Sequence, residues 1–300
     1  MLSIVRPDST ENSDVLLRSQ QRVIQSLQEE ILSLQDEVNL LRQRDETLKY
    51  YMQRVDEELR LAARLQRDFL PKTLPAVGPI TFDVLFRPAG YVSGDIYDVL
   101  RLDETHVGFY IADAVGHGMP AALLTMFIKR ALVTKEILKQ GYRLLAPGEA
   151  MARLNQALVE QELSQATFAT ALYGMIDTQS LLCTFARAGH PGPLLLSASG
   201  ELRTLEADGG LLGIFPDDSY SETTVQLHPG DRLVVFTDGV EVLLADSGSS
   251  DANAWHSQLM TRKSLGTCEL LRELGAKIDG SAGSLRPADD LTILIAGVGC

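Results

Sequence analysis

The stretch GFYIADAVGHGMPAAL, residues 108–123, combines an apolar strand, a glycine-rich turn and the start of a helix. The apolar run ends at Asp113, and two glycines flank His117. Pro120 stands in the first turn of the expected helix, where its missing N–H leaves no hydrogen bond unmade. Because glycines let a backbone and a hydrated ion approach closely, the stretch predicts a carboxylate at a strand end beside an open turn.

Other aspartates stand in the same context. Asp95 opens a strand in VSGDIYDVL, Asp238 ends one in LVVFTDGV, and Asp289 and Asp290 open one in RPADDLTILIA. Taken singly, an Asp-Gly after a strand is usually only a turn. Taken together, carboxylates at strand ends can converge on one point. Their oxygens suit two Mg²⁺ or Mn²⁺ ions that share a water and orient a phosphoryl group.

Three further polar residues have two interpretations each. His117 is either a proton relay or a loop histidine that orients a carbonyl or water, and the second is favoured. The turn around His190, in RAGHPGPLLL, is expected near the site without a catalytic role. Asp98 either supports the site or only continues polar alternation along its strand. The turn after Asp113 is not a Walker loop, because no Lys-Ser/Thr follows it.

The rest of the C-terminal region alternates between strand and helix patterns. Hairpin-like spacing, with paired helices and no βαβ alternation, favours antiparallel sheets. The expected strands are 81–89, 95–102, 106–113, 167–177, 181–188, 192–197, 201–206, 222–228, 232–237 and 291–298. The expected helices are 119–139, 148–162, 254–263 and 267–279, and Asp246 to Asn253 is expected to form a loop.

The N-terminal region has the pattern of a coiled coil. No Pro or Gly occurs from Asp14 to Leu70, and twelve of the fourteen a and d positions between Leu17 and Ala62 are apolar. β-branched residues at a and Leu at d favour a parallel dimer. The alternative is a single amphipathic helix packed on its own domain, for which the period would drift toward 3.6. Asp45 occupies an a position and weakens that layer.

The composition argues against several classes of protein. The 300 residues carry a net charge of −13, so binding to nucleic acid or anionic membranes is not expected. Cys183, Cys268 and Cys300 are widely spaced and indicate neither a zinc site nor a disulfide framework. The N-terminus lacks the apolar segment of a signal peptide, and no apolar run is long enough for a membrane helix. We therefore expect a cytoplasmic protein.

Seven motifs occur in order along the chain: SGDIYD, ADAVGHGMPAAL, TFATALYGMID, ARAGHPGPLLL, GGLLGI, FTDGVEV and DDLTILI. Together they resemble the metal-dependent PPM (type 2C) serine/threonine phosphatases, and most of all the bacterial SpoIIE-type branch of stress-response and sporulation regulators. AARLQRDFLP resembles the helix that leads into those domains, so the resemblance covers 62–300. Departures at Ser93, Ala114-Val115 and Glu241-Val242 bear on substrate choice or regulation more than on metal binding.

The resemblance implies an αββα sandwich of two antiparallel sheets flanked by helices, with two or more Mn²⁺ or Mg²⁺ ions between the sheets. It implies phosphoserine or phosphothreonine substrates on a regulatory partner, often an anti-sigma-factor antagonist. Asp95, Asp113 and Asp238 would act through a metal-bound water. The implied metal ligands are Asp95, Asp113, the Ala114 carbonyl, Asp238, and Asp289 with Asp290.

These observations predict three parts: a flexible N-terminus (1–13), a coiled-coil helix and linker (14–71), and a phosphatase domain (72–300). The predicted function is a homodimeric, metal-dependent protein phosphatase that receives its signal from a sensor on another chain. One alternative is a signalling adaptor whose phosphatase-like domain binds phosphorylated partners but turns over poorly. A hydrolase of small phosphates is less favoured, because no basic nucleotide-cradling loop is visible.

Overall fold

The computed structural model describes residues 9–163, 167–244, 255–281 and 289–299. Its internal contacts divide the chain into two compact units, Met1–Leu59 and Arg60–Cys300. The expected loop from Asp246 to Asn253 lies outside the described residues. Of the cysteines, Cys183 and Cys268 are free thiols.

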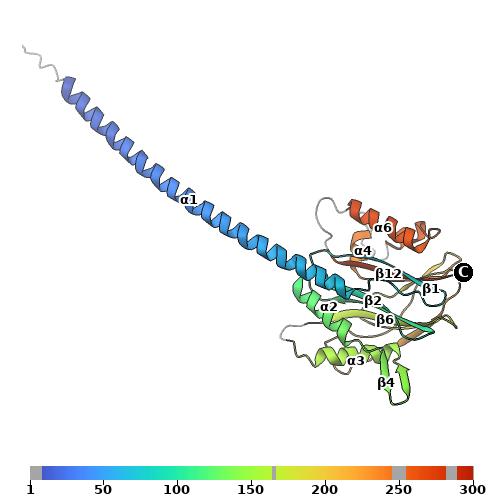
Figure 1. Cartoon of the computed structure of the whole chain (residues 1–300). Coiled ribbons are helices and arrows are strands. Elements are labelled where there is room, and N and C mark those ends of the chain that lie inside the picture. The colour runs from blue at the N-terminus through green and yellow to red at the C-terminus, as the bar shows by residue number, and fades with distance from the viewer. Residues whose placement is uncertain (1–8, 164–166, 245–254, 282–288, 300) are drawn as a thin grey trace, which may run out of the picture. The chain divides into compact units, whose positions relative to one another are not determined.

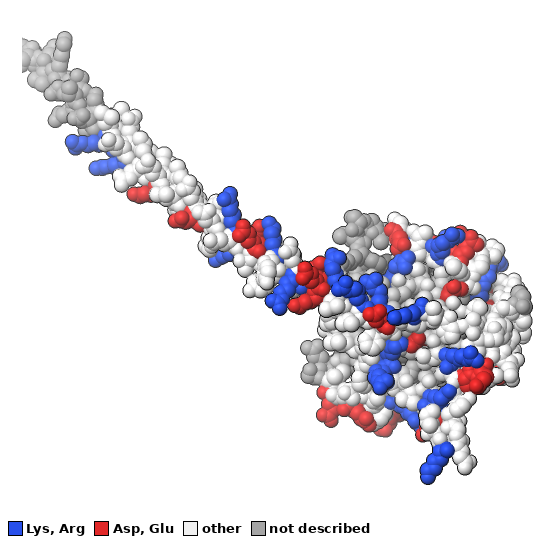
Figure 2. All heavy atoms as spheres, viewed as in Figure 1, with Lys and Arg blue, Asp and Glu red and all other residues white. Residues whose placement is uncertain are grey.

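Helix α1 (Ser9–Phe69) makes up the described part of the first unit, and its last turns, from Arg60 on, belong to the second unit. The helix ends two residues before Pro71. Its apolar heptad side chains between Leu17 and Val55 are 45% to 63% exposed on this single helix. Figure 2 shows acidic and basic side chains interspersed along it. The long helix is therefore confirmed, while its pairing with a second chain stays a prediction. No described helix is both long enough and apolar enough to cross a membrane.

The second unit contains two five-stranded sheets in which every strand pairing is antiparallel. The first has the order β1 (Ile80–Arg87), β12 (Leu291–Val298), β11 (Arg232–Phe236), β8 (Leu194–Leu196), β9 (Leu202–Thr204). The second has the order β10 (Glu222–Gln226), β7 (Leu182–Ala188), β6 (Ala169–Asp177), β3 (His106–Ala114), β2 (Asp95–Arg101). This arrangement confirms the predicted pair of antiparallel sheets.

Helices cover the outer face of each sheet (Figure 1). The second sheet contacts α2 (Met119–Ala131) and α3 (Pro147–Val159), and the first contacts α4 (Gly239–Leu244) and α6 (Thr267–Ser281). A short helix, α5 (His256–Thr261), precedes α6. One apolar cluster fills the space between the sheets and beneath α2 and α3, and another, which includes Trp255, packs the first sheet against α4 and α6. The predicted αββα sandwich is therefore confirmed.

The helix predicted for 119–139 is wrong in its second half. The helix ends at Ala131, and the chain then forms a hairpin of β4 (Lys135–Leu138) and β5 (Gly141–Leu144). β-branched residues follow Leu132, which is already extended, and such residues favour strand over helix. Gly141 takes a φ of 105° at the turn, a conformation that glycine adopts without strain. Helix α4, directly after Asp238, was also not predicted.

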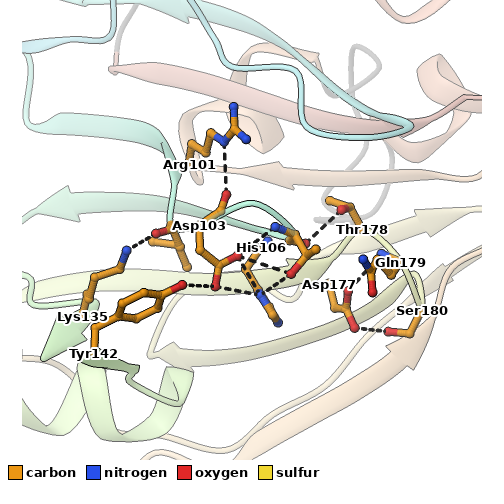
Figure 3. A network of polar contacts seen from close by, with 11 residues as sticks. Arg101, Asp103, His106, Lys135, Tyr142, Asp177, Thr178, Gln179 and Ser180 are labelled. Carbon is orange, nitrogen blue, oxygen red and sulfur yellow. Dashed lines mark hydrogen bonds and ion pairs between the residues drawn. The ribbon is translucent and has the colours of Figure 1, made fainter. Parts of the chain in front are cut away.

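The hairpin is fastened to the turn between β2 and β3 (Figure 3). Lys135 donates to the Leu102 carbonyl and stacks over the Tyr142 ring, and the Tyr142 hydroxyl lies 3.3 Å from Asp103 Oδ2. Burial would raise the pKa of Asp103, but hydrogen bonds from Thr105 and His106 lower it to about 2. The hairpin is thus held at the end of β2 opposite to Asp95.

The close packing of β3 against β6 in the second sheet can be tested by substitution. Gly174 faces Phe109 in the ladder, and a Cβ on Gly174 would come within 2.3 Å of the Phe109 ring. We expect Gly174→Ala to lower the free energy of unfolding by about 1–3 kcal/mol, because the buried ring must move. Urea denaturation measures the change. Gly280→Ala, with open space around it in α6, is the control and is expected to stabilise by up to about 1 kcal/mol.

Candidate active site

The predicted site residues come from both sheets and meet at one end of the sandwich. Asp95, the first residue of β2, lies directly opposite Asp113 of β3 in the antiparallel ladder. Asp238 follows β11, and Asp289 and Asp290 precede β12. Because β11 and β12 are neighbours in the first sheet, the ends of four strands bring these carboxylates toward one another.

Asp95 ties the two sheets together. Its side chain is buried, and its Oδ2 accepts hydrogen bonds from Thr237 Oγ1 at 2.8 Å and Thr292 Oγ1 at 2.6 Å. Both threonines belong to the other sheet, where the Thr292 N–H also donates to Thr237 Oγ1 at 2.9 Å. These threonines were not among the predicted site residues, although Thr237 directly precedes Asp238 in FTDG and Thr292 follows Asp290 by two residues in DDLT.

The five carboxylates differ in how far they are exposed to solvent. Asp95 and Asp290 are buried, Asp113 is half-buried, and Asp238 and Asp289 are exposed. The cluster can therefore be reached from solvent on its Asp238 and Asp289 side, while its base lies within the protein.

The carboxylates repel one another. Burial, followed by the charges of Asp238, Asp289 and Asp290, raises the pKa of Asp113 to about 7. Burial and the charge of Asp113 hold the pKa of Asp95 well above its usual range, and partial burial and Asp289 raise the pKa of Asp238. Among the residues that the structure describes, no Lys or Arg lowers the pKa of these three carboxyls. A bound cation would therefore relieve the repulsion.

Asp289 and Asp290 differ in what their oxygens already contact. Asp290 Oδ1 accepts from the Ala89 N–H at 2.7 Å, and its Oδ2 accepts from the Gly94 N–H at 2.6 Å. Asp289 Oδ1 accepts the N–H of its neighbour Asp290 at 2.8 Å. Asp290 therefore holds the loop before β2 with both oxygens, while Asp289 stands exposed beside the other carboxylates.

The backbone at Ala114 lies against the same loop. The Ala114 N–H donates to the Gly94 carbonyl at 2.9 Å. A Cβ on Gly94 would stand 3.1 Å from the Ala114 oxygen and 3.3 Å from the Ala121 Cβ, so a side chain at this position would crowd both. Glycine at 94 thus permits the close approach of the loop to the end of β3.

The donor set suits a hard divalent cation, because it consists of carboxylate and carbonyl oxygens with an excess of negative charge. Among the residues that the structure describes, no three His, Cys, Asp or Glu side chains form a ready-made ligand group. The residue types therefore fit such an ion, and the assignment of individual ligands stays a prediction.

The two histidines and Asp98 have different surroundings. His117 is exposed on the turn before α2. His190 is buried, its Nδ1 is 2.8 Å from Thr170 Oγ1, and burial lowers its pKa to about 3. Thr170 faces Asp113 in the ladder, so the neutral His190 ring supports the strand beside the site. Asp98 forms an ion pair with Lys129 of α2 and ties that helix to β2.

The fold is that of type 2C protein phosphatases. The PP2C domain of SiaA from Pseudomonas aeruginosa superposes with a TM-score of 0.68 at 25% identity, over 81% of this chain and 97% of that one. RsbX, solved in complex with magnesium, shares the fold with a TM-score of 0.52 at 19% identity, over 76% of this chain and 99% of that one.

The chain belongs to the SpoIIE family, because residues 103–299 match the family described as Stage II sporulation protein E (SpoIIE). One relative is the phosphoserine phosphatase RsbU of Bacillus subtilis (strain 168). It is 31% identical over 207 residues, which cover 69% of this chain and 60% of RsbU. The chain therefore spans less than two thirds of the length of that relative.

The pKa of Asp113 leads to a prediction for the metal-free protein. In the unfolded chain this carboxyl ionises near 3.8, but in the folded protein it ionises near 7. The folded state therefore binds more protons between these values, so stability falls as pH rises from about 4 to about 7. Asp113→Asn removes this loss. We expect the variant to exceed the wild type in stability by more at pH 8 than at pH 5, measured by urea denaturation in EDTA.

The control for this prediction is Asp279→Asn on α6, which changes the exposed ion pair of Asp279 with Arg87 of β1. It should alter stability little and without the same dependence on pH. If Asp113→Asn changed stability by the same amount at pH 5 and pH 8, the carboxyl would not have the raised pKa.

Proposed function

We propose that this protein is a metal-dependent phosphatase that hydrolyses phosphoserine or phosphothreonine on a regulatory protein. The observation that carries the proposal is the cluster of mutually repelling carboxylates, drawn from both sheets, in which Asp113 has a pKa of about 7. The name of the relative RsbU, a phosphoserine phosphatase, supports the activity. Family membership supports the same reaction class.

Within this proposal, Asp95, Asp113, the Ala114 carbonyl, Asp238 and Asp289 hold two or more Mn²⁺ or Mg²⁺ ions. When bound, these ions supply an activated water and neutralise charge on the phosphoryl group. Asp290 was also predicted as a ligand. Its two short hydrogen bonds to backbone N–H groups favour a different role, that of holding the loop before β2.

The proposed partners follow from the two units. The substrate is a phosphorylated regulatory protein, such as an anti-sigma-factor antagonist, and the activating signal comes from another chain in the cytoplasm. The exposed apolar heptad positions of α1 support a homodimeric coiled coil. A signalling adaptor with a weakly active domain is the alternative, distinguished by binding to a phosphoprotein without metal-stimulated turnover.

Asp238→Asn tests the catalytic proposal. The change keeps the side-chain shape but removes a charge from the ion-binding cluster. We expect the turnover of a phosphoserine peptide in Mn²⁺ to fall by more than about 100-fold, the upper end of the losses seen for residues that only support metal ligands. EDTA should abolish wild-type activity, and Mn²⁺ or Mg²⁺ should restore it without Zn²⁺.

Asp279→Asn again serves as the matched control, with turnover close to the wild type. Circular dichroism checks that both variants are folded. Near-normal turnover by folded Asp238→Asn would remove Asp238 from the ligand set, and activity that survives exhaustive chelation would contradict metal dependence altogether.

Asp45→Leu tests the proposed coil. In the single chain the Asp45 carboxylate pairs with Lys49 at 2.7 Å on the helix surface. In a dimer an a-position carboxylate is buried at a cost, so Leu should strengthen dimerisation by at least about tenfold. Sedimentation equilibrium measures the dissociation constant. Asp36→Leu, at an outer f position of the same helix, is the control and should leave the constant unchanged.

The same variant separates two roles for this layer. If Asp45 only fixes register, turnover of the fully dimeric variant equals that of the wild type. If the weak layer also sets the activity state of the phosphatase unit, turnover shifts together with the dissociation constant.

A further inference from the structure

A buried glutamine stands on the last turns of α1. Gln66 lies seven residues after Leu59, on the continuation of the a series, but it is only 7% exposed. Its Nε2 donates to the Ser93 carbonyl at 2.7 Å, and its Oε1 accepts from the Ser93 N–H at 2.8 Å. The amide thus pairs with both backbone groups of one residue. Nε2 also lies 3.5 Å from Thr125 Oγ1 of α2.

Ser93 belongs to the loop that leads into the carboxylate cluster. Its own side chain accepts the Asp95 N–H at 3.1 Å. The next residue, Gly94, is held by Asp290 from one side and by the Ala114 N–H from another. Three separate elements therefore fix this loop: the end of α1, the segment before β12 and the end of β3.

The contribution of Gln66 to this arrangement is specific. Ser93 is 0% exposed, so its N–H and C=O have no solvent to replace a lost partner, and buried backbone groups are rarely left unpaired. A side chain that fills the same space without an amide would leave both groups unsatisfied two residues before Asp95. The loop would then have to move to satisfy them.

We infer that Gln66 is a positioning residue for the metal site, acting through the backbone of Ser93 to hold Asp95 and the loop that faces Ala114. The inference rests on the proposed function, since it assumes that Asp95 and Ala114 hold divalent ions. Gln66 does not touch the ion or the phosphoryl group. It preorganises the ligands, as hydrogen-bonded supporting residues do in other metal sites.

The test compares three variants of the full chain. Gln66→Met keeps the length of the side chain but makes neither hydrogen bond. Gln66→Glu still accepts from the Ser93 N–H but cannot donate to the Ser93 carbonyl when ionised. Gln53→Met makes the same chemical change at an exposed position of α1 and serves as the matched control.

Two measurements do not depend on activity. Hydrogen exchange at residues 89–95 in the metal-free protein reports the order of the loop, and calorimetry with Mn²⁺ reports ion affinity. For Gln66→Met we expect faster exchange at Ser93 and Gly94 and affinity for Mn²⁺ weaker by about tenfold or more. The Mn²⁺ concentration for half-maximal hydrolysis of p-nitrophenyl phosphate should rise by the same factor. For Gln66→Glu, the exchange rate and the Mn²⁺ affinity should lie between those of Gln66→Met and the wild type. Gln53→Met should match the wild type in both measurements.

The outcomes separate the inference from the proposed function. Mn²⁺ affinity that is unchanged in folded Gln66→Met and Gln66→Glu would overturn the inference and leave Gln66 as a packing residue, even if the melting temperature fell. If Gln66→Met does not fold, unchanged affinity in Gln66→Glu alone overturns it. A wild-type protein that neither binds Mn²⁺ nor hydrolyses p-nitrophenyl phosphate or a phosphoserine peptide would overturn the proposed function, and the inference with it.

Discussion

A single buried carboxylate, that of Asp95, connects the two sheets by hydrogen bonds at the candidate site. Asp95 is the first residue of β2 in the second sheet, yet both of its hydroxyl partners, Thr237 and Thr292, come from the first sheet. A buried carboxylate is costly unless hydrogen bonds replace its lost hydration, so these contacts strongly favour one register between the sheets at this end. The positions of the other strand-end aspartates follow from that register.

The cluster around Asp95 works against folding. Burial and mutual repulsion raise the pKa values of Asp95, Asp113 and Asp238, and the free energy of ionising them must be offset by the rest of the domain. The apolar clusters on both sides of the first sheet supply that stability, including the edge-to-face contact of Phe236 with Trp255 at 4.6 Å. A rigid core can therefore hold together charges that a cation stabilises on binding.

Local patterns predicted most of the fold. Heptads predicted the long helix, and aspartates at the ends of apolar runs predicted the strands and the residues of the candidate site. The patterns failed between Leu132 and Leu144, where the chain leaves α2 and forms a hairpin. The apolar character of that segment suits either a helix or a strand. The turn at Gly141 and the contacts of Lys135 and Tyr142 with the segment after β2 lie outside such a pattern.

The sequence was sufficient to predict the residues of the candidate site, because carboxylates at strand ends can be recognised from residue type and spacing. The sequence was not sufficient to assign a separate role to each of those residues. The distinction between Asp289 and Asp290 rests on Gly94, 196 residues away from Asp290, and the place of Gln66 rests on Ser93, 27 residues away. Both depend on backbone N–H and C=O groups, which every residue except proline carries. Side-chain identity in the sequence therefore does not indicate these contacts.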